Sequence, residues 1–385
     1  MVTNSYYPAT EEGGPPFSNR ELAESMVRAG AKVVVVTTDR NGAGRLKVST
    51  NQWTNVGGVS VFYARTRSGA WIRSPEFRRA TRDAIAKAHI CLMSSVFWNY
   101  TGLSCWRACL ESGIPYISYP RGLLGPSALQ YKQLKKMIYW KLIARRIVNG
   151  SSAIVMLADR EAKLVAQMRL TPRVIVIPNG APRAIEASVS SPASSVGTRV
   201  EVLRRDGYLL FLGRVHATKG LDLLLPAFAA SVANGVSARL IIAGPIDKSY
   251  EVEFRKVLSQ CSVANRVEVV GTVSGPEKYD LLRGARAFVL CSYGEGLPVA
   301  VLEAMSVGTP VIVTEECNLP DVAREHAGIE VQLNVRSISD AIDTIWSDDQ
   351  LRQELSANAI RLTRDKFSWD SIGARTVALC RDIIT

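Results

Sequence analysis

Short apolar runs alternate with helical stretches along this chain of 385 residues, and that alternation strongly limits the folds available to it. Strands that alternate with helices form βαβ units, in which the strands are parallel and the helices cover the sheet. In the first half the expected strands are Lys32–Thr38, Val59–Ala64, Ile90–Ser94 and Tyr116–Ser118, with helices at Arg20–Ala29 and Pro75–Ala88. The pattern predicts an α/β protein with parallel sheets.

A second alternating series follows an interruption at residues 181–200, which are rich in Ser, Pro and Ala and lack periodicity. Such a composition is typical of a linker. Two domains of ordinary size fit the length, and we place them at residues 1–183 and 201–367, with a linker at 184–200. Beyond the linker the expected strands are Tyr208–Leu212, Arg239–Ala243, Val267–Val270, Ala287–Cys291 and Pro310–Val313, and the expected helices are Gly220–Asn234, Tyr250–Cys261, Glu277–Gly284 and Ser368–Ile384.

The N-terminus and the apolar runs indicate where the protein acts. Only Met1-Val2-Thr3 precede the polar Asn4-Ser5, so either the first strand is short or the start is misplaced, and we favour the second. The sequence has no run of about 18 apolar residues, so no transmembrane helix is expected. No secretory signal is recognised, and we therefore expect a cytoplasmic protein.

Positive charge is concentrated in the first half of the chain. Residues 1–185 hold 26 Lys and Arg against 10 Asp and Glu, whereas residues 186–385 hold 21 against 25, within a total net charge of +12. Such an asymmetry indicates an anionic partner for the first half, either a membrane surface or an acidic lipid-linked substrate. Nucleic acid is not expected as a partner, because no nucleic-acid-binding motif is recognised.

A basic amphipathic stretch, Ala128–Val148, lies within this half. Helices of this composition can lie at a membrane interface, where each Lys or Arg contributes about 1 kcal/mol. The pattern fits equally a stripe that faces the core beneath a solvated basic face, and the sequence leaves both open. The basic residues are Lys132, Lys135, Lys136, Lys141, Arg145 and Arg146, interleaved with Tyr131, Leu134, Ile138, Tyr139, Trp140 and Ile143.

The seven cysteines indicate neither a disulfide framework nor a metal centre. Cys105 and Cys109 are four residues apart and can share a helix face, but no His or Cys near them in the sequence completes a set of metal ligands. We expect buried, reduced thiols and no metal.

The segment Ser292–Ile312 combines two carboxylates, Glu295 and Glu303, with a Gly-x-Pro turn and an apolar helical run. A helix that begins at such a turn presents free N–H groups and a positive dipole end, which attract phosphate. The glutamates can accept hydrogen bonds from hydroxyl groups. The segment therefore offers an anion site and a polyol site together, which is the combination that a nucleotide-sugar requires.

Three other segments carry candidate binding residues near the expected carboxyl ends of strands. Arg214 and Lys219 flank a loop where two cations can neutralise a diphosphate, while His216 between them is expected to be an ordinary surface residue. Gly13-Gly14 precede a helix and allow a ligand to approach the backbone closely. Arg121 ends a strand of the basic half, where it can meet a sugar or an acceptor, or lie in a surface turn.

Taken in order, these motifs resemble those of the retaining glycosyltransferases of family 4, which have the GT-B fold of two Rossmann-like doubly wound domains facing across a cleft. The resemblance covers nearly the whole chain and implies that the last helix, residues 368–385, returns to the first domain. It rests on Gly13-Gly14-Pro15, Pro120-Arg121-Gly122, Ile177-Pro178-Asn179-Gly180, Gly213-Arg214, Lys219-Gly220, Ala243-Gly244-Pro245, Glu295 through Glu303 and Phe367-Ser368-Trp369.

The resemblance implies roles for the matching residues. Arg214 and Lys219 are expected to bind the donor diphosphate, and Glu295 to hold the donor sugar. Many relatives carry His at the position of Arg121. This difference leaves open the role of Arg121 and the sugar that the site prefers. The other expected contacts with the nucleotide-sugar come from Gly14, which reaches the diphosphate from the first domain, Pro245, Val273 near the base, Gly296, Leu297 and Pro298 beside the sugar and its phosphate, and Glu303 at the ribose.

The implied reaction is the transfer of a hexosyl unit, with retention, from a nucleotide-diphosphate sugar to a lipid-linked glycan during synthesis of a surface polysaccharide such as lipopolysaccharide. Neither a metal nor a cofactor beyond the donor co-substrate is expected, and the enzyme is expected at the inner face of the plasma membrane. One alternative is a nucleotide-sugar epimerase, although three isolated histidines supply few acid or base groups. Another is a catalytically silent nucleotide-sugar-binding protein. A dinucleotide oxidoreductase is not supported, because its Gly-x-Gly-x-x-Gly motif is missing.

Overall fold

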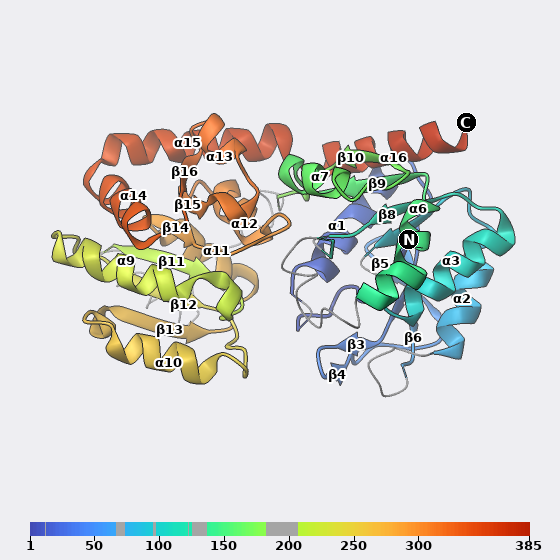
Figure 1. Ribbon diagram of the computed structural model, residues 1–385, viewed down its shortest axis with the longest axis horizontal. Coiled ribbons are helices and arrows are strands. Elements are labelled where there is room, and N and C mark those ends of the chain that lie inside the picture. The colour runs from blue at the N-terminus through green and yellow to red at the C-terminus, as the bar shows by residue number, and fades with distance from the viewer. Residues whose placement is uncertain (12, 67–73, 95–97, 122, 125–136, 182–206) are drawn as a thin grey trace. The chain divides into compact units, whose positions relative to one another are not determined.

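The computed structural model describes residues 1–11, 13–66, 74–94, 98–121, 123–124, 137–181 and 207–385. Two compact units are formed, one by Met1–Asn179 with Trp369–Thr385 and the other by Gly180–Ser368 (Figure 1). Each unit contains its own largely parallel sheet with helices packed on it, so the predicted α/β class with parallel sheets in two domains is confirmed. The predicted linker, 184–200, lies outside the described residues.

The first unit is built on an eight-stranded sheet in the order β10-β9-β8-β7-β1-β2-β6-β5. All neighbouring strands are parallel except β5 and β6, which form an antiparallel edge. The strands are β1 (Val2–Thr3), β2 (Val34–Thr38), β5 (Trp53–Val56), β6 (Val59–Ala64), β7 (Cys91–Ser94), β8 (Tyr116–Tyr119), β9 (Ala153–Met156) and β10 (Arg173–Val176), beside a separate hairpin of β3 (Arg40–Asn41) and β4 (Gly44–Arg45).

The helices of this unit have recognisable start and stop signals. The hydroxyl of Ser74 caps α2 by accepting a hydrogen bond from the N–H of Phe77 at 3.1 Å, and Pro75 takes the first helical position. Gly113 ends α3 in the left-handed conformation. The helices are α1 (Pro15–Arg28), α2 (Pro75–Ile85), α3 (Tyr100–Ser112), the π-helical η1 (Trp140–Ala144), α6 (Arg145–Asn149), α7 (Asp159–Ala166) and α16 (Trp369–Ile384).

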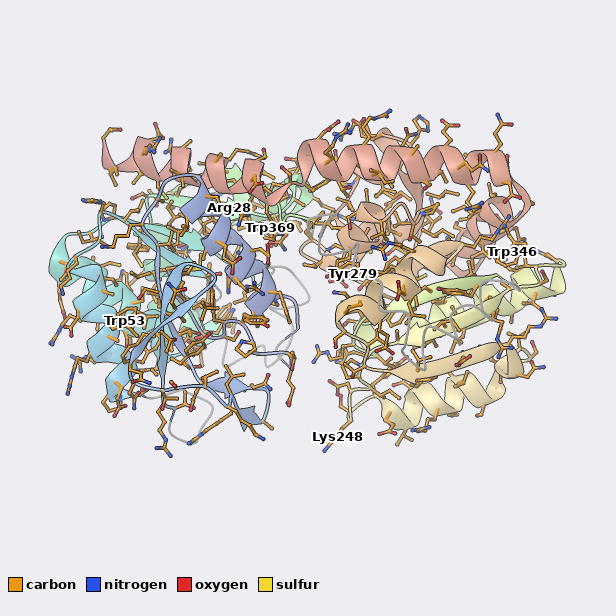
Figure 2. The ribbon with its side chains drawn as sticks, turned by 180° about the vertical axis from the view of Figure 1, so that it is seen from behind. Arg28, Trp53, Lys248, Tyr279, Trp346 and Trp369 are labelled. Atoms are coloured by element: carbon orange, nitrogen blue, oxygen red, sulfur yellow. The ribbon has the colours of Figure 1, made fainter. Side chains whose placement is uncertain are left out.

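The last helix, α16, packs against α1, although more than 300 residues separate them in the sequence. Gly373 lies so close to Ser25 of α1 that a Cβ would not fit between them. At one end of the contact, Arg28 Nε donates to Asp370 Oδ1 at 2.7 Å, next to Trp369 (Figure 2). The residues that α16 buries join one apolar cluster with α1 and the sheet.

The second unit has six parallel strands in the order β13-β12-β11-β14-β15-β16. This is the strand order 3-2-1-4-5-6 of a doubly wound sheet, whose ligands bind outside the carboxyl ends of the strands where the order reverses, here between β11 and β14. The strands are β11 (Tyr208–Leu212), β12 (Arg239–Ala243), β13 (Val267–Gly271), β14 (Ala287–Leu290), β15 (Val311–Thr314) and β16 (Gly328–Val331).

Most helical elements of the second unit lie between consecutive strands, and two helices follow the last strand (Figure 1). They are η2 (Ala217–Lys219), α9 (Leu221–Ala233), α10 (Glu251–Gln260), η3 (Ala264–Arg266), α11 (Gly275–Gly284), α12 (Val299–Ser306), η4 (Glu315–Cys317), α13 (Asp321–Arg324), α14 (Val335–Ser347) and α15 (Asp349–Lys366).

The basic stretch is described only from residue 137, because residues 125–136 lie outside the described part. Ile147 and Val148 are buried, so one stripe of the helix formed by η1 and α6 faces the core. Met137, Ile138 and Leu142 are 50%, 50% and 60% exposed, so a second apolar stripe faces solvent. None of the described helices is long and apolar enough to cross a membrane.

Candidate active site

The loops that follow β11, β12, β14 and β15 meet at the carboxyl edge of the sheet in the second unit. The loop after β11 carries Arg214 and Lys219, and the loop after β14 carries Ser292 and Glu295. Because β11 and β14 are neighbours at the point where the strand order reverses, these two loops come together there.

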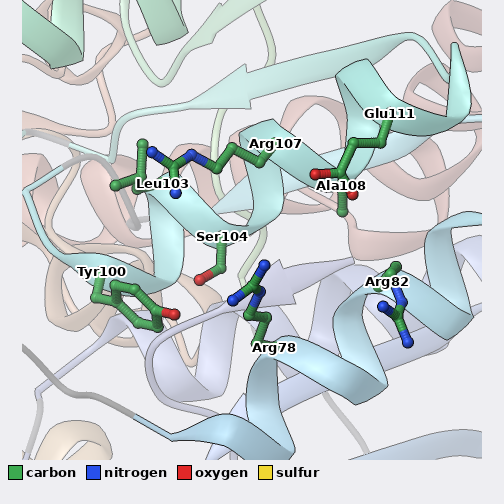
Figure 3. A pocket seen from close by; sticks show the side chains of 8 residues that line it. All are labelled: Arg78, Arg82, Tyr100, Leu103, Ser104, Arg107, Ala108 and Glu111. Carbon is green, nitrogen blue, oxygen red and sulfur yellow. The ribbon is translucent and has the colours of Figure 1, made fainter.

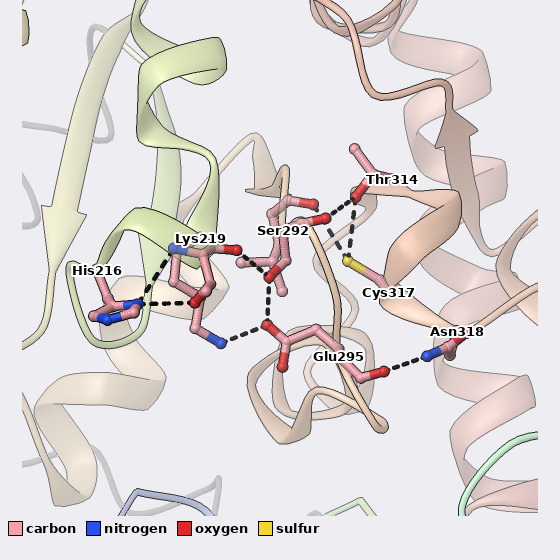
Figure 4. A network of polar contacts seen from close by, with 9 residues as sticks. His216, Lys219, Ser292, Glu295, Thr314, Cys317 and Asn318 are labelled. Atoms are coloured by element: carbon pink, nitrogen blue, oxygen red, sulfur yellow. Dashed lines mark hydrogen bonds and ion pairs between the residues drawn. The ribbon is translucent and has the colours of Figure 1, made fainter. Parts of the chain in front are cut away.

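Lys219 and Glu295 form an ion pair at this point (Figure 4). Their side chains are only 22% and 14% exposed, so the pair is largely shielded from water. The hydroxyl of Ser292 lies 2.7 Å from the same oxygen, Oε1, and 2.8 Å from the carbonyl oxygen of Thr218. The carboxylate of Glu295 is therefore held in one orientation, and among the described residues its other oxygen, Oε2, has no hydrogen-bond partner.

The backbone of Glu295 is fixed by the loop after β15. Its N–H donates to the carbonyl oxygen of Glu316 at 2.9 Å, and the side-chain amide of Asn318 donates to its carbonyl oxygen (Figure 4). Thr314 donates to the carbonyl oxygen of Ser292 at 2.8 Å. Beneath them Cys317 is buried, and this burial raises the pKa of its thiol to about 12, so it stays neutral and serves as packing.

Glycines allow these loops to approach one another. Gly220, which follows Lys219, has a left-handed backbone with φ of +67°, and a Cβ there would clash with the carbonyl oxygen of Cys291. Gly244 after β12 has φ of +136°, and a Cβ there would clash with the carbonyl oxygen of Gly213. Both positions thus require glycine for conformation and for space.

The start of α12 offers hydrogen-bond donors beside the ion pair. Gly296, Leu297 and Pro298 lead from Glu295 into this helix. In the described part of the chain, the N–H groups of Gly296, Leu297 and Val299 have no hydrogen-bond acceptor. Together with the helix dipole, these N–H groups can form an anion-binding site.

Glu303 lies one turn further along α12 and pairs with Lys278 of α11, with 2.8 Å between Lys278 Nζ and Glu303 Oε1. Its side chain is 14% exposed. Val273 precedes α11 and is half-buried, and Pro245 follows β12, so both lie along the same sheet edge. The structure thus brings the predicted residues of this unit to one edge.

Arg214 and His216 belong to the loop after β11. Arg214 is 59% exposed and its guanidinium lies 3.3 Å from a carboxylate oxygen of Asp247, a loose contact that leaves it free to turn toward a ligand. His216 Nδ1 accepts from the N–H of Thr218 at 3.2 Å and so caps η2. Partial burial and the charge of Arg214 lower the pKa of His216, so its ring is neutral at pH 7 and its role is structural.

Arg121 lies in the first unit, after β8, with φ of +49°. Its Nε donates to Ser94 at 2.9 Å, and its Nη1 donates to Ser18 at 3.0 Å and to Asn179 at 2.7 Å. Burial lowers the pKa of this arginine to about 10, which still leaves it charged at pH 7. Arg121 therefore links the ends of β7 and β8 to the start of α1 and to Asn179, the last residue of the segment Met1–Asn179.

Gly14 is the N-cap of α1 and is exposed, as is Gly13, whose φ is +77°. A Cβ at Gly13 would meet nothing within 4 Å, so the loop has open space before it. Pro15 and Pro16 occupy the first two helical positions and lack N–H groups, so this helix end presents fewer donors than the start of α12.

Sequence reasoning missed several residues of these networks. Ser292 and Asn318 orient Glu295, and Lys278 pairs with Glu303; only the position of Ser292, three residues before Glu295, gives a local signal. It also missed Cys91 of β7, whose sulfur lies 3.5 Å from that of Cys105. With Cys109, these buried thiols have sulfurs within 4.8 Å of one another, so a third cysteine that is distant in the sequence lies beside Cys105 and Cys109.

Comparison with known proteins places these features in a family. The profile of the Glycosyl transferase 4-like domain matches residues 13–180, and that of Glycosyl transferases group 1 matches residues 200–362. The chain belongs to family 4 of the glycosyltransferases. This family 4 glycosyltransferase is 26% identical over 391 residues to an uncharacterized glycosyltransferase of Methanocaldococcus jannaschii, which covers 98% of the chain and 96% of the relative.

Another relative is the GDP-mannose:cellobiosyl-diphosphopolyprenol alpha-mannosyltransferase of Xanthomonas oryzae pv. oryzae, 24% identical over 325 residues and 81% of each chain. Among solved structures, sucrose-phosphate synthase from Thermosynechococcus elongatus superposes with a TM-score of 0.78 at 18% identity, over 99% of this chain and 98% of that one. Anabaena HepE in complex with UDP and glucose gives 0.77 at 16% identity, over 99% and 100%. These similarities confirm the predicted GT-B fold.

Proposed function

We propose that this glycosyltransferase moves a hexosyl unit, with retention, from a nucleotide-diphosphate sugar to a lipid-linked glycan in the synthesis of a surface polysaccharide. The observation that carries the donor part is the shielded Lys219–Glu295 pair beside the free N–H groups at the start of α12. The relative that acts on a diphosphopolyprenol-linked sugar supports the acceptor part.

Donor binding exchanges the partners of the ion pair. The ammonium of Lys219 turns from Glu295 to the diphosphate, and Arg214 leaves its loose contact with Asp247 for the same anion. The N–H groups of Gly296 and Leu297 donate to the phosphate that carries the sugar. Glu295, still oriented by Ser292, then accepts from a hydroxyl of that sugar.

Glu303 is the proposed acceptor for the ribose hydroxyls. Lys278 keeps it oriented, because the two side chains are paired and largely shielded from solvent. Val273 and Pro245, further along the sheet edge, contact the base end of the nucleotide.

The reaction itself breaks the bond between the anomeric carbon and the phosphate oxygen. Positive charge develops on the carbon and negative charge on the leaving phosphate, which Lys219, Arg214 and the α12 N–H groups stabilise. The acceptor hydroxyl attacks the face from which the phosphate leaves and gives its proton to the departing phosphate oxygen, so the configuration is retained. Because protein cations neutralise the diphosphate, we propose a reaction that requires no metal.

The basic first unit is the proposed acceptor side, docked on the anionic inner face of the plasma membrane. Met137, Ile138 and Leu142 form an exposed apolar stripe, with the exposed cations Lys141 and Arg145 beside it. This combination suits an interface where apolar residues enter the lipid and cations meet its headgroups.

Thermal unfolding with a panel of UDP-, GDP-, ADP- and TDP-sugars tests the donor assignment. A ligand at 100 times its Kd stabilises a protein by about 2.7 kcal/mol, so one nucleotide class is expected to raise the melting temperature clearly. A flat response across the panel would count against nucleotide-sugar binding.

Glu295→Gln is the second test of this function. The neutral amide keeps the size of the side chain but weakens both the ion pair and the acceptance of a sugar hydroxyl. We expect turnover of the donor identified by the panel to fall sharply while the protein stays folded. Near-normal turnover would exclude the proposed role of Glu295.

A further inference from the structure

A hollow on the surface of the first unit lies between α2 and α3 (Figure 3). It contains about 320 Å³ of empty space, part of it open to solvent. Its lining is Arg78 and Arg82 from α2, with Tyr100, Leu103, Ser104, Arg107, Ala108 and Glu111 from α3.

Three arginines line this hollow. Arg78 and Arg82 are one turn apart on α2, and Arg107 lies on α3; in Figure 3 the guanidinium of Arg78 lies beside Ser104, and that of Arg107 extends toward Leu103. Among the described residues, Arg78 and Arg107 have no ion-pair partner, and Arg82 has only a loose contact with Asp83 at 3.6 Å. The single acidic residue of the lining is Glu111, so the hollow carries excess positive charge.

The wall of the hollow also contains an unused hydroxyl. Ser104 is only 7% exposed, and its Oγ is buried without any hydrogen-bond partner in the described structure. Figure 3 shows this hydroxyl directed toward the space beside Arg78 rather than away from it. A buried polar group without a partner is destabilising, so its presence at a basic hollow indicates a missing acceptor.

Small side chains make the space. Ser104 and Ala108 are four residues apart on α3 and therefore lie on one face of that helix, where larger residues would fill the gap to α2. A set of guanidinium groups with a hydroxyl donor suits a phosphoryl group, whose oxygens accept several hydrogen bonds from arginine at once.

We propose that the hollow lined by Arg78, Arg82, Ser104 and Arg107 binds a phosphoryl group, in a second anion site that is separate from the donor site. The group belongs either to the headgroup of an anionic lipid or to a soluble phosphate compound. The hollow lies in a different unit from Lys219 and Glu295, so the proposal does not depend on the donor assignment.

Three variants of the full chain test the site. Arg78→Ala, Arg82→Ala and Arg107→Ala combined remove its charge, and Ala108→Leu fills the hollow but keeps all three arginines. The matched control combines Arg336→Ala, Arg361→Ala and Arg364→Ala, which removes three exposed arginines from the second unit. The probes are inorganic phosphate, followed by the melting temperature, and phosphatidylcholine vesicles with and without phosphatidylglycerol, followed by co-sedimentation.

Both hollow variants are expected to bind at least about tenfold more weakly than the control triple variant, because one lacks the charge-assisted hydrogen bonds and the other lacks the space for the group. A loss confined to phosphatidylglycerol vesicles assigns the site to a lipid headgroup. A loss of phosphate-induced stabilisation assigns it to a soluble phosphate.

Equal binding by the hollow variants and the control triple variant, with both probes, would overturn the proposal. Ala108 is buried in the core of the first unit, so if Ala108→Leu fails to fold, the arginine variant decides alone, since it changes only exposed side chains. Each variant is also titrated with the donor identified by thermal unfolding. A variant that has lost phosphoryl binding but responds normally to the donor shows that the hollow acts separately from the donor site. If the proposed function were wrong, the donor titration would fail while the phosphoryl-binding result would be unaffected.

Discussion

Lys219 is the residue whose removal affects donor binding most directly. Its ammonium is shielded and paired with Glu295, so Lys219→Ala removes one cation from the diphosphate site and leaves a largely buried carboxylate without its counter-charge. Deleting one group that stabilises developing negative charge lowers kcat by roughly 100- to 1,000-fold. We expect a loss of this size, with weaker donor binding, measured by release of the nucleoside diphosphate and by titration.

Lys248→Ala is the matched control for this prediction. Lys248 is an exposed lysine of the same unit, in the loop after β12 (Figure 2). Its replacement makes the same change in net charge but is expected to leave turnover unchanged. Unchanged donor affinity in Lys219→Ala would show that this lysine does not bind the diphosphate.

Local motifs made some site residues predictable and left others hidden. Glu295 and Lys219 each lie in a short segment whose residue types indicate anion or polyol binding. Lys278 is different, because its contact with Glu303 spans 25 residues and depends on how α11 packs beside α12. Cys91 likewise meets Cys105 only because β7 lies beneath α3 in the fold. Contacts of this kind follow from the packing of elements, which spacing in the sequence does not give.

Gly220 connects η2 to α9. Its left-handed backbone and its lack of a side chain allow the loops after β11 and β14 to meet. Its backbone is left-handed, and its Cα faces the carbonyl oxygen of Cys291 without room for a methyl group. Gly220→Ala therefore combines strain of about 1 kcal/mol or more with a clash that separates the two loops. We expect lower stability in chemical denaturation and loss of the donor-induced rise in melting temperature.

Gly235, at the other end of α9, supplies the control. Its φ is +100°, yet a Cβ there would meet nothing within 4 Å. Gly235→Ala is expected to cost only the strain of the backbone, with a normal response to the donor. Similar losses of donor response in both variants would mean that Gly220 acts through backbone strain alone and not through its contact with Cys291.

The elements themselves were predictable where apolar runs are long or well bounded. The five strands expected in the second unit lie within one residue of those observed. β9, β10 and β16 were missed, whereas the equally short β7 and β8 were recognised, because periodicity alone does not decide whether a short apolar run is a strand. α3 was missed because its Thr, Ser and Cys residues blur the helical pattern.

At the scale of the whole molecule, the chain leaves the first unit and later returns to it. The two crossings, near Asn179 and Trp369, are tied together, since the N–H of Ala181 donates to the carbonyl oxygen of Phe367 at 2.7 Å. The second unit is therefore a continuous segment, whereas the first is completed only when α16 is added. Stability of the first unit thus depends on the last 17 residues of the sequence.

Deletion of residues 369–385 is expected to unfold the first unit and spare the second. α16 buries Trp369, Ile372, Val377 and Leu379 in the cluster shared with α1. At about 1.5–3 kcal/mol for each buried side chain, their loss approaches the whole stability of a typical domain, about 5–15 kcal/mol. Limited proteolysis should then cut residues 1–179 rapidly, while the donor still raises the melting temperature of the remaining folded part.

Deletion of only Ile384 and Thr385, both exposed, is the control and should leave both units resistant to protease. Equal resistance of the two truncated chains would mean that the sheet of the first unit is stable without α16. Loss of the donor response in the longer deletion would mean that the second unit also depends on this helix. Retention of that response, with rapid cleavage of the first unit, would show that nucleotide binding belongs to the continuous second unit alone.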